Sequence, residues 1–329
     1  MKLDFNDLLI VPKDITPITT RSIIDPFIKN YLPLMTAPMD TVVNEINATI
    51  YFANRIITCL PRGVKLKQGF KSFSILEVEK LFNEGNLNPN GKYLIDVANG
   101  HMENILSISK DIKEKYPNLK LMVGNIANPK SFENLSNVGV DFIRIGIGAG
   151  AGCLTTKNTG VGYPMASLIK ECYAVSVTLK KPAYIVADGG MQGYADIIKA
   201  LALGADYVML GSVFNKALES AGPNYLWRRI RVSQKVAEKA YKYGIPVYKK
   251  FRGMSTKEVQ RKWGAKIIKT SEGVIRYRKV EYTLAQWCEN FEHYLRSAMS
   301  YTGSHNLKEF VGNVNLIQIT DNAYKRFDK

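Results

Sequence analysis

Seven short apolar runs recur along the chain and constrain its fold more than any other feature. They lie at 33–38, 56–60, 93–98, 120–125, 142–147, 183–188 and 207–211. Most of these runs lack alternation of apolar and polar residues, which indicates strands that are buried on both faces, as in a parallel sheet. A weaker run, interrupted by lysines, predicts an eighth strand near 247–251.

Helix-like stretches separate these runs, at 101–116, 129–138, 163–179 and 193–203. The second stretch begins with a capping residue and a proline, Asn128-Pro129, and Gly139 follows its end. Repeated strand–helix units in a chain of 329 residues predict an α/β fold, a (β/α)8 TIM barrel, rather than a Rossmann domain. Because no linker divides the chain, we expect residues 1–329 to form a single catalytic domain.

Composition excludes several classes of protein. Hydrophobic residues make up 46% of the chain and charged residues 22%, as in globular proteins rather than disordered or fibrous ones. No apolar run approaches the roughly 20 residues of a membrane helix, and the first residues lack the layout of a signal peptide. The four cysteines show no zinc-ligand or disulfide spacing. We therefore expect a cytoplasmic protein that does not interact with membranes.

The formal net charge of +16 is concentrated in one segment. Residues 226–281 hold 17 basic and 4 acidic side chains, and so contribute +13 of the total. A surface of this kind attracts anionic partners such as a nucleotide phosphate, a nucleic acid or an acidic protein. Alternatively, the charge only solvates the surface. We expect this basic segment to be mobile.

The glycine-rich segment 146–164 holds the clearest candidates for chemistry. Its glycines allow sharp turns and a close approach of backbone groups to a ligand. Cys153 lies in this loop, where backbone dipoles favour the nucleophilic thiolate, and Thr155 is within reach to relay a proton. The same loop also fits a tight strand–helix connection around a passive small residue. The other cysteines (Cys59, Cys172 and Cys288) lie in contexts typical of core thiols.

Two glycine turns follow the last predicted strands, Asp188-Gly189-Gly190 and Gly211-Ser212. Turns at this place in a barrel commonly bind phosphate through backbone N–H groups, and an aspartate before such a turn suits ribose hydroxyls. Ordinary turn glycines with a capping aspartate are the alternative. The three histidines lack metal-ligand spacing, and no GxSxG motif of a serine hydrolase occurs.

Longer segments resemble the IMP dehydrogenase/GMP reductase family from about Leu3 to Gly303. The resemblance is closer to the GMP reductases, because DVANG at 96–100 and the triplet Ser271-Glu272-Gly273 follow their pattern. The inserted cystathionine-β-synthase repeats (the CBS domain) and the long flap of IMP dehydrogenases are absent, although 248–254 and 295–303 look more like a dehydrogenase. The matching segments are 3–13, 37–42, 96–100, 123–127, 159–164, 186–214 and 295–303.

The resemblance implies an NADPH-dependent enzyme of purine metabolism that converts GMP to IMP and ammonia. In such an enzyme Cys153 forms a covalent thioimidate at purine C2, while Thr155 and Glu272 protonate the departing amine. Three alternatives stay open. They are an IMP dehydrogenase without the CBS domain (IMP to XMP with NAD), a paralogue for a deoxy or modified purine nucleotide, and a non-catalytic relative that binds nucleotides or nucleic acid.

The resemblance also assigns binding roles. It implies a homo-oligomer, a tetramer or octamer, and nucleic acid is not an expected partner of a catalytic member. The implied substrate residues are Met39, Ala151, Asp188, Gly190, Met209, Gly211, Ser212, Met254, Ser255, Ser271 and Gly273. The implied cofactor residues are Asp96, Asn125, Arg144, Gly146 and Gly148, and the carbonyls of Gly148, Gly150 and Cys153 are implied ligands of a monovalent cation such as K⁺.

The chain departs from the family pattern at several of these places. Ala151 replaces a serine that holds the phosphate, and the loss of one such bond costs about 1.5–3 kcal/mol. Pro61-Arg62-Gly63 stands where reductases have His-Lys-His, so we expect Arg62 to pair with Asp96 in place of the lysine. Lys269 replaces an arginine, and residues 280–283 replace a Pro-Tyr-Lys-Gly stretch.

Overall fold

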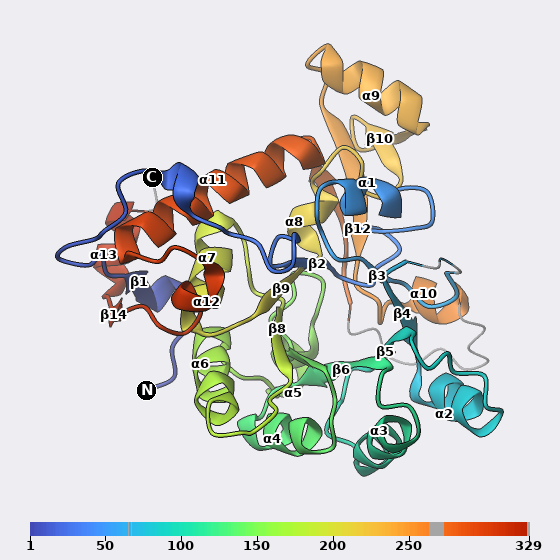
Figure 1. Cartoon of the computed structure of the whole chain (residues 1–329). Helices are drawn as coiled ribbons and strands as arrows, with labels where there is room; N and C mark the ends of the chain where they lie inside the picture. Colours follow the sequence, from blue (N-terminus) through green and yellow to red (C-terminus); the bar gives the residue numbers. More distant parts are fainter. Residues whose placement is uncertain (65, 67, 263–272, 328–329) are drawn as a thin grey trace.

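A ring of eight parallel strands forms the centre of the computed structural model, which describes residues 1–64, 66, 68–262 and 273–327 (Figure 1). The strand order is β2-β9-β8-β7-β6-β5-β4-β3, and a parallel bridge between Met35 and Ile57 joins the two ends. This ring confirms the predicted barrel. The strands are β2 (Leu34–Thr36), β3 (Cys59–Leu60), β4 (Phe70–Phe73), β5 (Lys92–Asp96), β6 (Lys120–Ile126), β7 (Phe142–Ile145), β8 (Tyr184–Asp188) and β9 (Tyr207–Leu210).

The eighth barrel strand is β4, and the prediction of a barrel strand at 247–251 was wrong. β4 pairs in parallel with β3 and β5, whereas 247–251 lies in β12 (Val247–Arg252), which pairs antiparallel outside the barrel. The sequence of β4, FKSF, contains a lysine and a serine and so lacks a continuous apolar run. Burial alternates along the first part of β12, as expected for a strand in an antiparallel sheet.

Helices cover the outer side of the barrel and enclose the main hydrophobic core. The four predicted helical stretches are confirmed as α3, α4, α6 and α7. At α4 the Asn128 side chain accepts from the Lys130 N–H, and Gly139 beyond its end has a φ of +88°. The covering helices are α1 (Ala48–Ala53), α2 (Ile75–Asn83), α3 (Glu103–Lys115), α4 (Pro129–Asn137), α6 (Met165–Ser176), α7 (Tyr194–Leu203) and α11 (Leu284–Thr302).

The two ends of the chain meet on one side of the barrel (Figure 1). β1 (Leu8–Ile10) pairs antiparallel with β14 (Leu316–Gln318). The buried ammonium of Lys199 donates to the Phe5 carbonyl at 2.9 Å and so ties the N-terminal segment to α7. The remaining short elements on this side are η1 (Phe5–Asp7), η2 (Arg21–Ile23), α12 (Leu307–Phe310) and α13 (Asp321–Phe327).

A second, antiparallel sheet projects from the barrel, and its strands lie mostly within the basic segment 226–281 (Figure 1). Its strand order is β11-β10-β12-β13, with β10 (Asn224–Leu226), β11 (Ile230–Val232) and β13 (Ile275–Lys279), and α9 (Gln234–Lys242) packs on it. We call these strands and α9 the projecting module. Its small core consists of Leu218, Ala237, Ala240, Val247 and Val280. Among the described residues, no helix is both long and apolar enough to cross a membrane.

Replacing Phe70 by alanine tests the assignment of β4. The Phe70 ring is buried inside the barrel, where its centroid lies 5.2 Å from that of Phe142. We expect Phe70→Ala to lower the free energy of unfolding by about 3–5 kcal/mol, because it leaves a cavity in the barrel interior. Phe73→Ala, on the half-buried side of the same strand, serves as the control and should cost less than half as much in urea unfolding. Equal losses would contradict the placement of Phe70.

Candidate active site

A cavity of about 420 Å³ opens at the carboxyl ends of the barrel strands. Its walls come from the residues that follow β2, β5, β6, β7, β8 and β9. Because all eight strands are parallel, these ends meet on a single rim, which is where barrel enzymes carry their active sites. The rim gathers the polar and glycine residues that the sequence places after its apolar runs.

Most of the predicted site residues line this cavity together. Among the predicted site residues that the structure describes, only Gly273 does not line the cavity. It forms an isolated antiparallel bridge with Cys153 instead. Ser271, Glu272 and the departure Lys269 lie outside the described residues. The predicted residues that line the cavity are Met39, Asp96, Asn125, Arg144, Gly146, Gly148, Gly150, Ala151, Cys153, Thr155, Asp188, Gly190, Met209, Gly211, Ser212, Met254 and Ser255.

Cys153 is the cysteine that faces the cavity. Its thiol is half-buried and donates to the Thr155 hydroxyl at 3.2 Å, at the start of α5 (Thr155–Thr159). The other three cysteines lie in the core, and burial raises the pKa of each of their thiols to about 12. Those thiols therefore stay protonated at neutral pH, which leaves Cys153 as the candidate nucleophile.

Neighbouring backbone segments fix the cysteine loop. The Cys153 N–H donates to the Gly150 carbonyl at 2.9 Å, and the Val274 N–H donates to the Gly152 carbonyl at 3.2 Å. Gly148, with a φ of +80°, could not carry a side chain, because a Cβ atom there would lie 1.6 Å from Oγ1 of Thr156. The loop is thus held between the barrel and the segment that begins β13.

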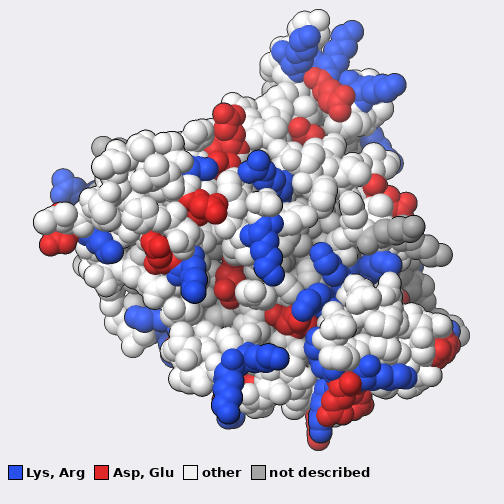
Figure 2. All heavy atoms as spheres, in the orientation of Figure 1, with Lys and Arg blue, Asp and Glu red and all other residues white. Residues whose placement is uncertain are grey.

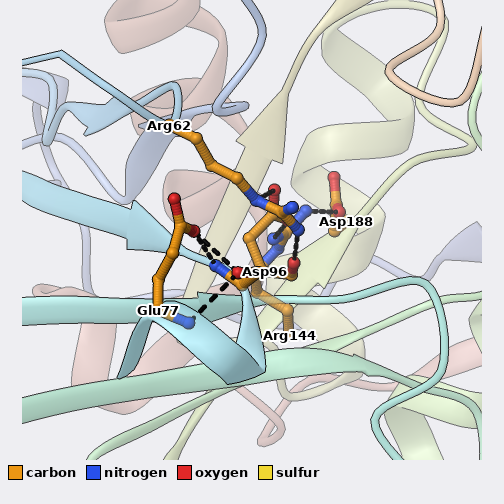
Figure 3. Close-up of polar contacts among 6 residues, drawn as sticks. Arg62, Glu77, Asp96, Arg144 and Asp188 are labelled. Carbon is orange, nitrogen blue, oxygen red and sulfur yellow. Dashed lines mark hydrogen bonds and ion pairs between the residues drawn. The ribbon is translucent and has the colours of Figure 1, made fainter. Parts of the chain in front are cut away.

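A buried arginine joins three strand ends across the floor of the site (Figure 3). Arg144 of β7 is 5% exposed, and its Nη1 and Nη2 lie 2.6 Å from Asp96 Oδ1 and 2.8 Å from Asp188 Oδ2. Asn125 donates to the same Asp188 oxygen at 2.8 Å and to the Gly146 carbonyl at 2.8 Å. Burial alone would lower the pKa of Arg144, but the charges of Asp188 and Asp96 outweigh it and raise that pKa. Arg144 is therefore a permanent cation.

Arg62 also contacts Asp96, as the sequence predicts (Figure 3). It donates to the Asp96 carbonyl, and its Nε lies 3.8 Å from Asp96 Oδ2. Asp96 therefore has two cationic neighbours, Arg62 and Arg144. Glu77, also drawn in Figure 3, accepts from the Ser74 N–H in the cap of α2.

Sequence reasoning missed Arg252, which anchors the segment carrying Met254 and Ser255. Arg252 is buried at the end of β12, where Nη2 lies 2.5 Å from Asp40 and Nη1 lies 2.5 Å from Glu258 of α10 (Lys257–Lys262). The pair with Asp40 joins the projecting module to the loop after β2. The available signal was Asp40, a charged residue four positions after the end of a buried strand.

In the described part of the chain, no three His, Cys, Asp or Glu side chains are grouped to hold a metal ion. His101, near the same rim, has both ring nitrogens engaged. Its Nδ1 lies 2.8 Å from the Ser131 hydroxyl, and Nε2 accepts from the Ala127 N–H at 3.0 Å. Burial lowers the pKa of His101, consistent with a neutral, structural ring.

Comparisons with known proteins point to one family. The model of the IMP dehydrogenase / GMP reductase domain matches residues 92–327. GMP reductase 2 of Bos taurus is 30% identical over 97% of this chain and 95% of that protein. GMP reductase 2 of Homo sapiens is 29% identical over 100% of this chain and 97% of that protein. GMP reductase of Phytophthora infestans is 28% identical over 100% of this chain and 94% of that protein.

Replacing Arg144 by methionine tests the charge network. The change removes the cation that pairs with Asp188 and one of the two cations beside Asp96, so we expect the free energy of unfolding at pH 7 to fall by about 3–5 kcal/mol. The loss should shrink at pH 5, because the unpaired carboxylates then take up protons, and it should largely disappear in the triple variant R144M/D96N/D188N. Arg62→Met, which removes contacts to Asp96 only, is the control. Urea unfolding that gives the same loss for R144M and R62M would contradict the central role of Arg144.

Proposed function

The chain belongs to the IMP dehydrogenase/GMP reductase family, and we propose that it is a GMP reductase, converting GMP with NADPH to IMP and ammonia in purine metabolism. One observation carries this proposal above all. Cys153 and Thr155, a nucleophile with a proton acceptor at 3.2 Å, line the cavity at the barrel rim. The similarity to GMP reductases over 97% or more of the chain supports the choice of reaction.

The two sides of the cavity suit a purine nucleotide. Met39, Met209 and Met254 offer apolar, adaptable surface for the base. Gly190, Gly211 and Ser212 offer backbone groups for the phosphate. In the described part of the chain, the contacts of Asp188 with Arg144 and Asn125 both use Oδ2, which leaves Oδ1 for the ribose hydroxyls.

Cys153 carries the covalent step. Its thiol gives its proton toward Thr155, and the thiolate adds to C2 of the base, so that a C–S bond forms and the C–N bond to the amine breaks. The amine needs a proton to leave as ammonia, and Thr155 with Glu272 supplies it. A nicotinamide cofactor, when bound, supplies the hydride that C2 receives. Cys153 leaves C2 with the electron pair of the C–S bond and is restored as a thiolate.

The residues assigned to the cofactor fit a nicotinamide. Asp96, Asn125 and Arg144 combine an acceptor, an amide and a cation on one side of the cavity. Gly146 and Gly148 complete this wall and keep it free of side chains. We propose NADPH as the cofactor, with NAD as the alternative.

Two further assignments belong to the same proposal. The carbonyls of Gly148, Gly150 and Cys153 bind a monovalent cation such as K⁺. Turnover that stays the same when potassium is replaced by lithium would contradict this assignment. The protein acts in the cytoplasm as a homo-oligomer, a tetramer or octamer.

The main rival is an IMP dehydrogenase that oxidises IMP to XMP. Buried Arg252, within the dehydrogenase-like segment 248–254, favours it, whereas the GMP reductases reported above favour the reductase. Ammonia release coupled to NADPH consumption separates the two. A deoxy or modified purine nucleotide remains the alternative substrate, because the phosphate loop has Ala151 in place of serine.

Replacing Cys153 by alanine tests the covalent step. We expect Cys153→Ala to abolish turnover while GMP still binds, because the nucleophile is lost and the cavity keeps its shape. In the wild type, denaturation with GMP in the absence of cofactor should trap a nucleotide adduct, seen by intact-protein mass spectrometry. Cys59→Ala, which removes a buried thiol inside the barrel, is the matched control and should still form the adduct. Near-normal turnover by Cys153→Ala would refute the covalent route.

Restoring a serine at position 151 tests the phosphate side. Ala151 lines the cavity, and a hydroxyl there can donate to the phosphate. We expect Ala151→Ser to lower the KM for GMP about tenfold with little change in kcat, since a hydrogen bond to a charged group contributes about 1.5 kcal/mol or more. Guanosine, which lacks the phosphate, is the control and should show no gain. An unchanged KM for GMP would place the phosphate elsewhere.

A further inference from the structure

The projecting module carries a group of cations that the proposed reaction does not use. Figure 2 shows Lys and Arg side chains gathered on the part of the molecule that projects in Figure 1. Residues 224–252 contain one acid, Glu238. We call the exposed cations of the β10–β11 turn, β11 and α9 the basic face. They are Arg228, Arg229, Arg231, Lys235, Lys239 and Lys242.

These cations have no neutralising partner among the described residues. In the part of the chain that the structure describes, none of the six forms an ion pair, and Arg228 alone has a partner, the Tyr248 ring at 4.9 Å. Lys235, Lys239 and Lys242 follow one another at helical spacing of four and three residues, which places them on one side of α9. The opposite side, with Ala237 and Ala240, packs on the sheet. The basic face is therefore turned to solvent.

Two aromatic rings border the basic face. Trp227, in the turn between β10 and β11, is 64% exposed, and Tyr243, directly after α9, is 69% exposed. Trp227 and Arg228 have φ angles of +47° and +61°, a conformation that favours glycine and that bulky side chains adopt at a cost. The turn thus holds a tryptophan and an arginine outward at its tip.

Neither the cavity nor the fold explains this surface. None of the six cations and neither ring lines the cavity, and the small core of the module uses other residues. A second copy of the chain is a poor occupant for the basic face, because each copy would bring a net charge of +16 and a like-charged surface. A lipid surface is disfavoured because α9 packs Ala237 and Ala240 against its own sheet and exposes a single large aliphatic side chain, Val236, which is too little apolar surface for an interfacial helix.

We propose that the basic face binds single-stranded nucleic acid. Unpaired lysines and arginines suit a row of phosphates, and exposed rings at the border suit stacking of unpaired bases. This inference goes beyond the reductase activity and does not depend on it. It also revises the sequence-based expectation that nucleic acid is not a partner, because the structure exposes the unpaired cations and the rings on one projecting module.

Binding of a labelled oligouridylate to the full-length protein, followed by fluorescence anisotropy, tests the proposal. We expect the triple variant K235Q/K239Q/K242Q to bind at least tenfold more weakly at about 50 mM salt. Its plot of log affinity against log salt should be shallower by about 2, since each phosphate contact on a single strand contributes about 0.7. Trp227→Ala should weaken binding about fivefold or more through lost stacking, and a duplex of equal length should bind more weakly than the single strand.

A matched triple variant provides the control. K170Q/K180Q/K181Q removes three exposed lysines from α6 and the loop after it and should bind the oligouridylate as the wild type does. All variants should unfold in urea at the wild-type midpoint, which shows that they fold. An equal loss in the control variant, or no effect of Trp227→Ala, would overturn the proposal. So would binding to phosphatidylserine vesicles that depends on the same residues while oligouridylate does not bind.

Discussion

The ion pairs of Arg144 with Asp96 and Asp188 are the interaction on which the rest of the site depends. A parallel barrel brings the carboxyl ends of all its strands to one rim, so acidic residues at those ends face one another at short range. Without a cation between them, two such carboxylates would repel or take up protons. Arg144, itself on a strand, neutralises both and links β5, β7 and β8. Arg144 thus connects Asp188, on the ribose side of the proposed site, with Asp96, on its cofactor side.

The nucleophile is placed by a different means. The cysteine loop leaves the barrel after β7, and backbone hydrogen bonds to Gly150 and Val274 hold it against the segment before β13. The buried Arg252 forms an ion pair with Asp40 and so positions the adjacent segment that carries Met254 and Ser255. The Cys153 thiol lines the cavity beside the Thr155 hydroxyl, and Arg144, Asp96 and Asp188 line the same cavity. A thiol in such a place can add to a ring carbon, and the amine can then leave. The antiparallel sheet therefore contributes to the active site as well as carrying the basic face.

Most of the barrel could be predicted from the sequence, because strands buried on both faces leave continuous apolar runs. β4 escaped prediction because its lysine and serine interrupt the run, and β12 was misplaced because burial patterns do not reveal which sheet a strand joins. The wall of the cavity was predictable through family motifs at the strand ends. The role of Arg252 could not be predicted, because it depends on ion pairs with Asp40 and Glu258. Asp40 lies far from both of these residues along the chain. The exposure of Trp227 likewise follows from the conformation of one turn.

The central claim is that this site reduces GMP, and one paired assay tests it most directly. Purified protein is mixed with GMP and NADPH, and in parallel with IMP and NAD⁺, while the near-ultraviolet absorbance of the reduced cofactor and the release of ammonia are followed. The account predicts that absorbance falls with GMP, in step with one ammonia for each NADPH consumed, and that IMP with NAD⁺ gives no rise. A rise with IMP and NAD⁺, with no ammonia from GMP, would contradict it and assign the protein to the dehydrogenases.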